Sequence, residues 1–113
     1  MSQITTHILD TARGQPASGV SLVLFELDGD MWTQLAAGVT NDDGRVPDLL
    51  PADRVLPART YRMHFATADY FSNRGEPVFY PWVDVVFNLD GSGDHYHIPL
   101  LLAPFGYSTY RGS

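Results

Sequence analysis

The chain has 113 residues, 44% hydrophobic and 18% charged, a composition typical of one soluble folded domain over residues 1–113. Its formal charge is −6, and all seven basic side chains are arginines, which excludes the basic surface that nucleic-acid binding requires. The absence of cysteine excludes disulfide bonds and a cysteine nucleophile.

The N-terminal segment MSQITTHILD has neither the basic region nor the apolar region of a secretory signal. No apolar run approaches the roughly 20 residues that span a bilayer. The sequence therefore predicts a cytoplasmic protein that does not bind membranes. Sparse arginines on an acidic chain are better suited to a planar or anionic small molecule, because the guanidinium group presents a fixed fork of donors.

Short apolar or alternating segments separated by turns predict an all-β fold. In the first of them, Ile4 and Ile8 lie on one face and His7 on the other. A helix is expected over 67–75, with Thr67 as its cap and Gly75 as its stop. About eight strands with frequent turns indicate a mostly antiparallel sandwich. The expected strands cover residues 4–10, 20–27, 31–35, 45–47, 59–67, 82–88 and two segments around Ala103-Pro104.

Histidines are the best candidates for acid–base chemistry. His95 and His97 are two residues apart on an expected strand, so they share a face, and Tyr96 points the other way. Any single strand histidine is more often structural than catalytic, and that interpretation is preferred for His64. A metal site built from His95, His97 and His7 is a weaker alternative, because no carboxylate or cysteine stands at metal-ligand spacing.

Two arginines complete the candidate set. Arg45 follows the turn Asn41-Asp42-Asp43-Gly44, and taken alone it is better explained by a surface ion pair with Asp42 or Asp43. Arg111 stands near the end of the chain, directly after Tyr110. Aromatic residues before it argue for an ordered, packed end rather than a frayed tail. Phosphate loops, nucleophile elbows and dinucleotide fingerprints are absent from the sequence.

Two segments carry a family resemblance. HYHIPLLLAPFGYSTYRGS at 95–113 resembles the C-terminal signature of the 5-hydroxyisourate hydrolases, and THILDTARGQPA at 6–17 resembles their first signature. The resemblance covers nearly the whole chain. It implies a transthyretin-like sandwich of two four-stranded sheets with one short helix. It also implies a homotetramer, a dimer of dimers with active sites at the interface between dimers.

The resemblance also implies an activity without a cofactor: hydrolysis of 5-hydroxyisourate to 2-oxo-4-hydroxy-4-carboxy-5-ureidoimidazoline in urate degradation. Catalytic roles fall on His7, Arg45 and His97, and substrate binding falls on Tyr110, Arg111, Gly112 and Ser113. No residue is assigned to a metal. The two histidines would share general-base and proton-delivery work, and the sequence does not say which does which.

The alternative is a non-catalytic carrier of small molecules with the same fold. Transthyretin, the hormone carrier, typically has lysine, glutamate and threonine where this chain has His7, Arg45 and His97, and it continues past the tetrapeptide at 110–113. The chain therefore resembles the enzymes rather than the carrier. Because one fold hosts both functions, the distinction rests on these residues and not on the fold.

Overall fold

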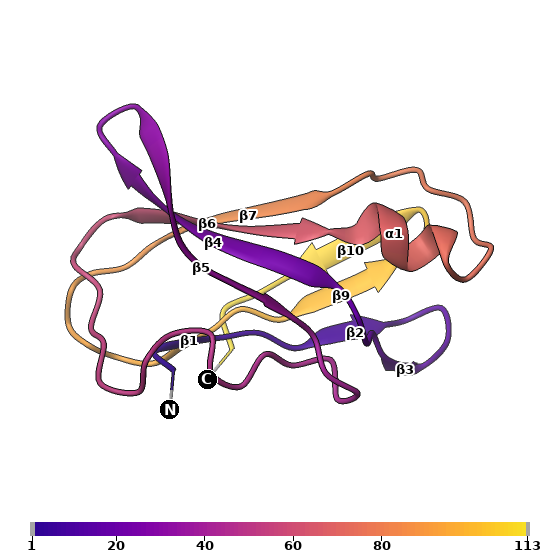
Figure 1. Cartoon of the computed structure of the whole chain (residues 1–113), viewed down its shortest axis with the longest axis horizontal. Helices are drawn as coiled ribbons and strands as arrows, with labels where there is room; N and C mark the ends of the chain where they lie inside the picture. The colour runs from indigo at the N-terminus through magenta and orange to yellow at the C-terminus, as the bar shows by residue number, and fades with distance from the viewer. Residues whose placement is uncertain (1, 113) are drawn as a thin grey trace.

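The computed structural model describes residues 2–112 and contains two four-stranded sheets and one two-stranded sheet. Figure 1 shows the strands running roughly along the long axis, with a hairpin that projects from one end. The elements in chain order are β1 (Ile4–Thr5), β2 (Ile8–Asp10), β3 (Gln15–Pro16), β4 (Ser21–Asp28), β5 (Met31–Val39), β6 (Thr60–Ala66), α1 (Thr67–Ser72), β7 (Val83–Asn88), β8 (Tyr96–His97), β9 (Leu100–Ala103) and β10 (Gly106–Thr109).

The first large sheet has the order β5-β4-β6-β7 and is antiparallel throughout. Its projecting hairpin turns at Gly29, whose φ of 63° suits glycine in a tight turn. Strand β6 alternates between buried Tyr61, Met63 and Phe65 and half-buried residues between them. This period of two is the sequence signature of a strand with one buried face.

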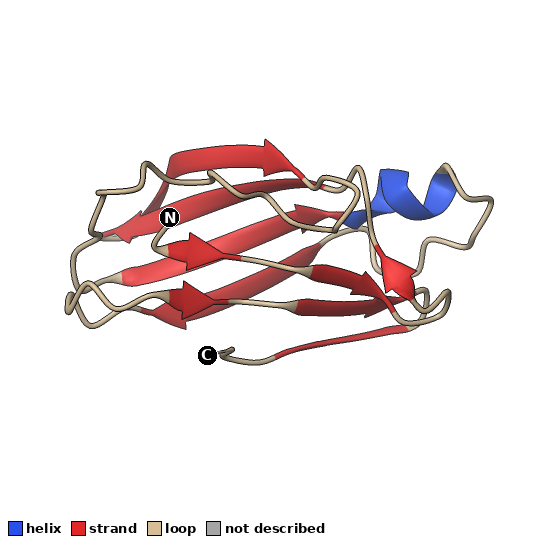
Figure 2. Cartoon of the chain, turned by 90° about the horizontal axis from the view of Figure 1, so that it is seen from below, coloured by secondary structure: helices blue, strands red, loops and turns tan. Residues whose placement is uncertain are grey.

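The second large sheet has the order β10-β9-β2-β3, in which β2 pairs parallel to β9 and the other pairs are antiparallel. The two-stranded sheet, β1 with β8, is also parallel and continues the line of β2 and β9. Figure 2 shows this arrangement from below, with α1 beyond one end of the strands. Residues 3–10 and residues 96–102 therefore run side by side.

The core lies between the two sheets and consists of side chains whose exposed fraction is nearly zero. Its burial supplies most of the driving force for folding. The helix α1 adds Tyr70 and Phe71 to this core. No helix in residues 2–112 has the length and apolar character needed to cross a bilayer. The largest fully buried side chains of the sheets are Ile4, Ile8, Leu22, Leu24, Tyr61, Met63, Phe65, Leu100 and Leu102.

The predicted all-β sandwich with one short helix is confirmed, but four details of the prediction were wrong. Residues 2–112 form ten strands, not about eight, because the expected strand at 4–10 is divided into β1 and β2 and because residues 15–16 and 96–97 pair as well. The segment 45–47 forms only an isolated bridge. The helix ends at Ser72, and the hydroxyl of Thr67 donates to the carbonyl of Tyr80 rather than capping the helix.

Candidate active site

The parallel pairing of β1 with β8 brings Thr5 and His97 side by side. These two residues are direct partners in the ladder, and the backbone amides of Tyr96 and Ile98 donate to the carbonyls of Gln3 and Thr5, each at 2.8 Å. Tyr96 and Ile98 point into the core, so His95 and His97 share the opposite face, as predicted. The Thr5 hydroxyl lies 2.9 Å from Nε2 of His95 and 2.9 Å from Nδ1 of His97.

Arg45 is held beside this face by the turn that precedes it. The side chain of Asn41 accepts hydrogen bonds from the amides of Asp43 and Arg45, and the amide of Gly44 donates to the Asn41 carbonyl. Gly44 is buried with φ of 75°, and a Cβ there would collide with the backbone oxygen of Ile8. Only glycine satisfies both conditions, so the turn fits closely onto β2.

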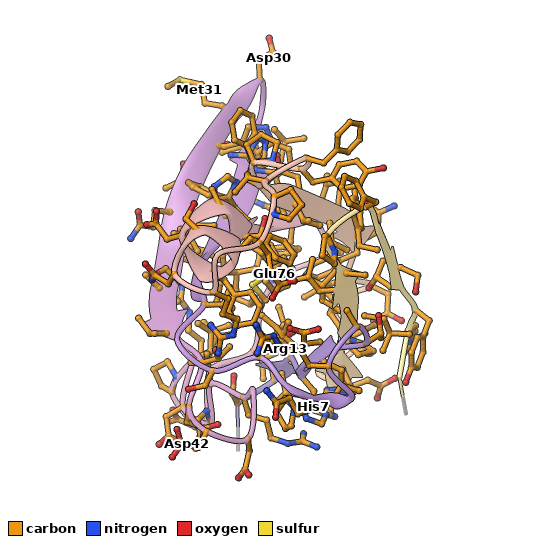
Figure 3. All side chains as sticks on the ribbon, turned by 90° about the vertical axis from the view of Figure 1, so that its right-hand side faces the viewer. His7, Arg13, Asp30, Met31, Asp42 and Glu76 are labelled. Carbon is orange, nitrogen blue, oxygen red and sulfur yellow. The ribbon has the colours of Figure 1, made fainter. Side chains whose placement is uncertain are left out.

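This close fit pairs Arg45 with His7. The two residues form an isolated antiparallel bridge, and the amide of Ile8 donates to the Gly44 carbonyl at 2.8 Å. The salt bridges within residues 2–112 do not include Arg45, so the expected surface pair with Asp42 or Asp43 does not form. His7 itself is half-buried. In Figure 3 it lies at the edge of the molecule opposite the β4–β5 hairpin tip.

The C-terminal arm, residues 110–112, returns to His97. The amide of Gly112 donates to the His97 carbonyl at 2.8 Å, and the guanidinium of Arg111 lies 4.4 Å from the centre of the Tyr96 ring. Tyr110 is 59% exposed, so it is free to meet a ligand. The arm is therefore held against the strand that contains His97. Ser113, the last of the predicted substrate-binding residues, lies outside the described residues.

Gly112 is required by space rather than by backbone conformation. A Cβ there would lie 2.7 Å from Cδ2 of His97 and 3.1 Å from its Cβ. We expect Gly112→Ala to displace the ring or the arm and to lower kcat/KM for the reaction proposed below by about tenfold. Gly106→Ala is the matched control, because a Cβ at Gly106 would meet nothing within 4 Å. Equal rates in the two variants would show that this approach is not needed.

A cleft of about 380 Å³ opens over these residues and is lined by Thr5, Thr6, Arg45, Val46, Pro47, His95 and His97. Of the predicted catalytic residues, the structure brings Arg45 and His97 into its wall. His7 lies next to Arg45 in the backbone but is not part of the cleft lining. The arm touches His97 from the side of Gly112. The predicted residues therefore gather in one region, with Arg45 and His97 at its centre.

Burial lowers the pKa of His97 below its ordinary value, and the positive charge of Arg45 and the neighbouring rings of His95 and His7 lower it further. An imidazole in this state is neutral at physiological pH. It is thus free to accept a proton, which is what a general base requires.

This shift predicts the pH dependence of the rate. A neutral base is lost as pH falls through its pKa, so the acid limb of kcat/KM should have its midpoint below about 6.5, the value of an unperturbed histidine. The measurement is kcat/KM against pH in buffers of constant ionic strength. A midpoint above that value would contradict the assignment of this limb to His97.

Metal ligands do not gather here. Within residues 2–112, no three side chains of histidine, cysteine, aspartate or glutamate are placed to hold a metal ion together. His64 is expected from the sequence to be structural. It lies on β6, and its Nδ1 is 2.7 Å from a carboxylate oxygen of Asp84 on β7. It belongs to a different sheet from His97 and does not line the cleft, so it serves as an internal comparison for the cleft histidines.

Thr5 was not predicted as a site residue, although its signal was present in the sequence. The alternation at 4–10 already puts Thr5 on the face of His7, and a hydroxyl on that face has no partner in its own strand. Val46 and Pro47 were missed because they line the cleft only through the return of the turn onto β2. Sequence alone gives no distance between that turn and the strand.

The fold and the site together define a transthyretin-like β-sandwich whose surface cleft contains histidine and arginine. The model of the HIUase/Transthyretin family matches residues 4–112. The chain belongs to this family. It is 46% identical to 5-hydroxyisourate hydrolase of Mus musculus, over 99% of this chain and 96% of that protein. It is 45% identical to the 5-hydroxyisourate hydrolase of Mesorhizobium japonicum, over 98% of this chain and 92% of that protein.

Solved structures of both branches of the family are similar. Sea bream transthyretin in complex with thyroxine matches with a TM-score of 0.91 and 36% identity, over 98% of this chain and 95% of that one. The 5-hydroxyisourate hydrolase of Klebsiella pneumoniae matches with a TM-score of 0.83 and 39% identity, over 97% and 98%. The backbone alone therefore does not separate enzyme from carrier, and the side chains of the cleft must do so.

Proposed function

We propose that this chain catalyses the hydrolysis of 5-hydroxyisourate in urate degradation, by attack of water on a carbonyl of the six-membered ring. The observation that carries the proposal is a cleft whose wall contains Arg45 and the half-buried His97, a histidine whose pKa is lowered by burial and by Arg45. Two relatives that are 45% and 46% identical over nearly the whole chain bear the name 5-hydroxyisourate hydrolase, which supports the same activity.

In this mechanism His97 is the general base. Its pKa, lowered by burial and by Arg45, keeps the ring neutral, so that it accepts a proton from water as the water attacks the lactam carbonyl. The nitrogen that performs this step is Nε2, because Nδ1 is engaged by the Thr5 hydroxyl. His7 does not line the cleft but pairs through its backbone with Arg45 beside it, and we assign to His7 the delivery of a proton to the leaving ring nitrogen.

Arg45 stabilises the negative charge that develops on the carbonyl oxygen. A guanidinium without an ion-pair partner among residues 2–112 keeps its donors available for this oxyanion and for the planar urea-like groups of the ring. We assign substrate binding to Tyr110, Arg111, Gly112 and Ser113, of which Gly112 donates its backbone amide to the His97 carbonyl. Donors that are already in place cost no reorganisation when the charge appears, and this is why fixed donors accelerate such reactions.

We further propose that the cleft is completed by a second copy of the chain, in a homotetramer that is a dimer of dimers. Within residues 2–112, β7 and β10 are edge strands of their sheets. Tyr80, before β7, contacts Tyr107 of β10 with ring centres 5.0 Å apart, so both edges lie on one side of the sandwich. Unpaired edges are sites for pairing with another chain. Analytical ultracentrifugation tests the assembly state, and a monomer at micromolar concentration would contradict it.

The proposed activity is tested by adding the protein to 5-hydroxyisourate freshly generated from urate by urate oxidase. The near-ultraviolet absorbance of the substrate should decay faster than in the spontaneous reaction, in proportion to protein concentration. A folded protein that leaves the spontaneous rate unchanged would overturn the proposal. Saturable binding of thyroxine without catalysis would then favour the carrier function that the sea bream transthyretin complex represents.

Metal independence is a separate prediction of this mechanism. Because both proton transfer and charge stabilisation are assigned to side chains, EDTA should leave kcat/KM within about twofold of its value in untreated enzyme. The measurement compares protein dialysed against EDTA with the same protein after zinc is added back. A rate that is lost in EDTA and restored by zinc would require a metal-bound water instead.

A further inference from the structure

The Thr5 hydroxyl makes hydrogen bonds with two histidines at once. It lies 2.9 Å from Nδ1 of His97 in the cleft and 2.9 Å from Nε2 of His95, which is exposed. We propose that Thr5 and His95 form a proton relay that carries the proton accepted by His97 out of the cleft. This inference rests on the proposed hydrolase function and adds two residues to it, neither of which touches the reacting carbonyl.

The pairing of β1 with β8 builds this contact. Thr5 and His97 are partners in a parallel ladder, and the amide bonds from Tyr96 to Gln3 and from Ile98 to Thr5 flank them, both at 2.8 Å. A shift of one residue in this ladder would turn Thr5 away from both rings. The neighbouring Thr6 makes the contrast plain, because its buried hydroxyl donates to the Ile98 carbonyl at 2.6 Å and is used for structure.

A hydroxyl has one proton to donate and lone pairs to accept, so it can connect a donor on one side with an acceptor on the other. If His97 is to accept a proton at Nε2, its resting proton must be on Nδ1, where it donates to the Thr5 oxygen. The Thr5 proton then points to Nε2 of His95. This arrangement of protons leaves Nε2 of His97 free to accept a proton from water and Nε2 of His95 free to accept the proton of Thr5.

The transfer balances as follows. Water loses a proton to Nε2 of His97 as its oxygen bonds to the lactam carbonyl carbon. Nδ1 of His97 gives its proton to the Thr5 oxygen while the Thr5 proton passes to Nε2 of His95. His97 is again neutral, now protonated on Nε2, Thr5 is again a hydroxyl, and His95 holds the positive charge, which it loses by releasing a proton to solvent. Collapse of the adduct breaks the bond between the carbonyl carbon and the ring nitrogen, and that nitrogen takes its proton from His7. After the product leaves, His7 regains a proton from solvent, and exchange with water in the cleft returns the His97 proton from Nε2 to Nδ1. Hydrolysis of a lactam yields a carboxylic acid that ionises at neutral pH, so one proton must leave for solvent in each turnover.

The position of His95 suits this last step. It lines the cleft and also a second hollow of about 270 Å³, whose wall includes Gln3, Asp53 and Arg54. His95 is the one lining residue these two hollows share. The charged and titratable groups that affect the pKa of His97 are Arg45, His95 and His7, and the desolvation of His97 discourages it from keeping a proton. Burial thus disfavours a positive charge on His97, whereas the exposed ring of His95 can release a proton to solvent.

The relay predicts buffer dependence, which a purely structural role would not produce. In His95→Ala at low buffer concentration, kcat should fall roughly tenfold with KM unchanged, and added imidazole should restore it by accepting the proton directly. Thr5→Val, which keeps the β-branched shape but removes the hydroxyl, should show the same loss, and Thr5→Ser should retain most of the rate. A wild-type kcat in His95→Ala at the lowest buffer concentration would overturn the relay.

A measurement without substrate separates this inference from the proposed function. Nitrogen-15 NMR of the histidine rings in wild-type protein should report His97 with its proton on Nδ1, and Thr5→Val should change that tautomer preference while His64 stays as it was. A resting His97 protonated on Nε2 would overturn the relay even if the protein hydrolyses 5-hydroxyisourate. Conversely, a wild-type protein without hydrolase activity would overturn the proposed function, whatever tautomer the rings adopt.

Discussion

His97→Ala should lower kcat/KM by about 10²-fold or more, with the fold intact. The substitution removes the ring that lies between the Thr5 hydroxyl and Gly112. His95 cannot replace this ring as the base, because the Thr5 hydroxyl lies between the two histidines. The rate is measured with 5-hydroxyisourate in the absorbance assay, and the fold by circular dichroism and thermal unfolding.

The matched control is His64→Ala. His64 is also half-buried on a strand and also hydrogen-bonded, to Asp84, but it belongs to the β5-β4-β6-β7 sheet and does not line the cleft. It should retain a wild-type rate. If both variants keep a wild-type rate, the general base is not His97. If both lose it together with the native circular dichroism spectrum, His97→Gln, closer in size and polarity, gives the deciding rate.

Arg45→Ala should lower kcat/KM to a similar extent, about 10²-fold, because it removes the donor proposed for the oxyanion. Arg45 is exposed, so stability should change little. Arg45→Lys keeps the charge without the planar fork and should recover only part of the rate. The loss should fall mainly on kcat if the interaction strengthens in the transition state.

For this variant the control is Arg59→Ala, since Arg59 pairs with Glu26 at 3.2 Å on the surface of the other sheet. It should leave kcat and KM unchanged. A loss in Arg45→Ala confined to KM, with kcat at its wild-type value, would assign Arg45 to substrate binding instead of charge stabilisation.

Much of the fold could be predicted because a β-strand with one buried face has an alternating pattern within a few consecutive residues. The strands expected at 20–27 and 59–67 are present as β4 and β6, and Tyr61, Met63 and Phe65 form the buried face of β6. The short pairs at 15–16 and 96–97 could not be predicted in this way. They exist only because a distant strand lies alongside, and two residues contain no period.

The candidate site was predictable in its residue types and only partly in its arrangement. Alternation alone put His95 with His97, and His7 with Thr5, on common faces. That these two faces meet depends on the parallel pairing of β1 with β8, a contact across 92 residues. The approach of Gly112 to the His97 ring likewise depends on the path of the arm in the folded protein, and no local sequence pattern predicts it.

The central claim is that water attacks a ring carbonyl of 5-hydroxyisourate in the cleft between Arg45 and His97. Its most direct test is hydrolysis in oxygen-18 water, at an enzyme concentration where the spontaneous reaction is negligible, with mass spectrometry of the product. The product should be ring-opened and should contain one solvent oxygen in its new carboxylate. Substrate recovered intact, or a product without label in that carboxylate, would contradict it.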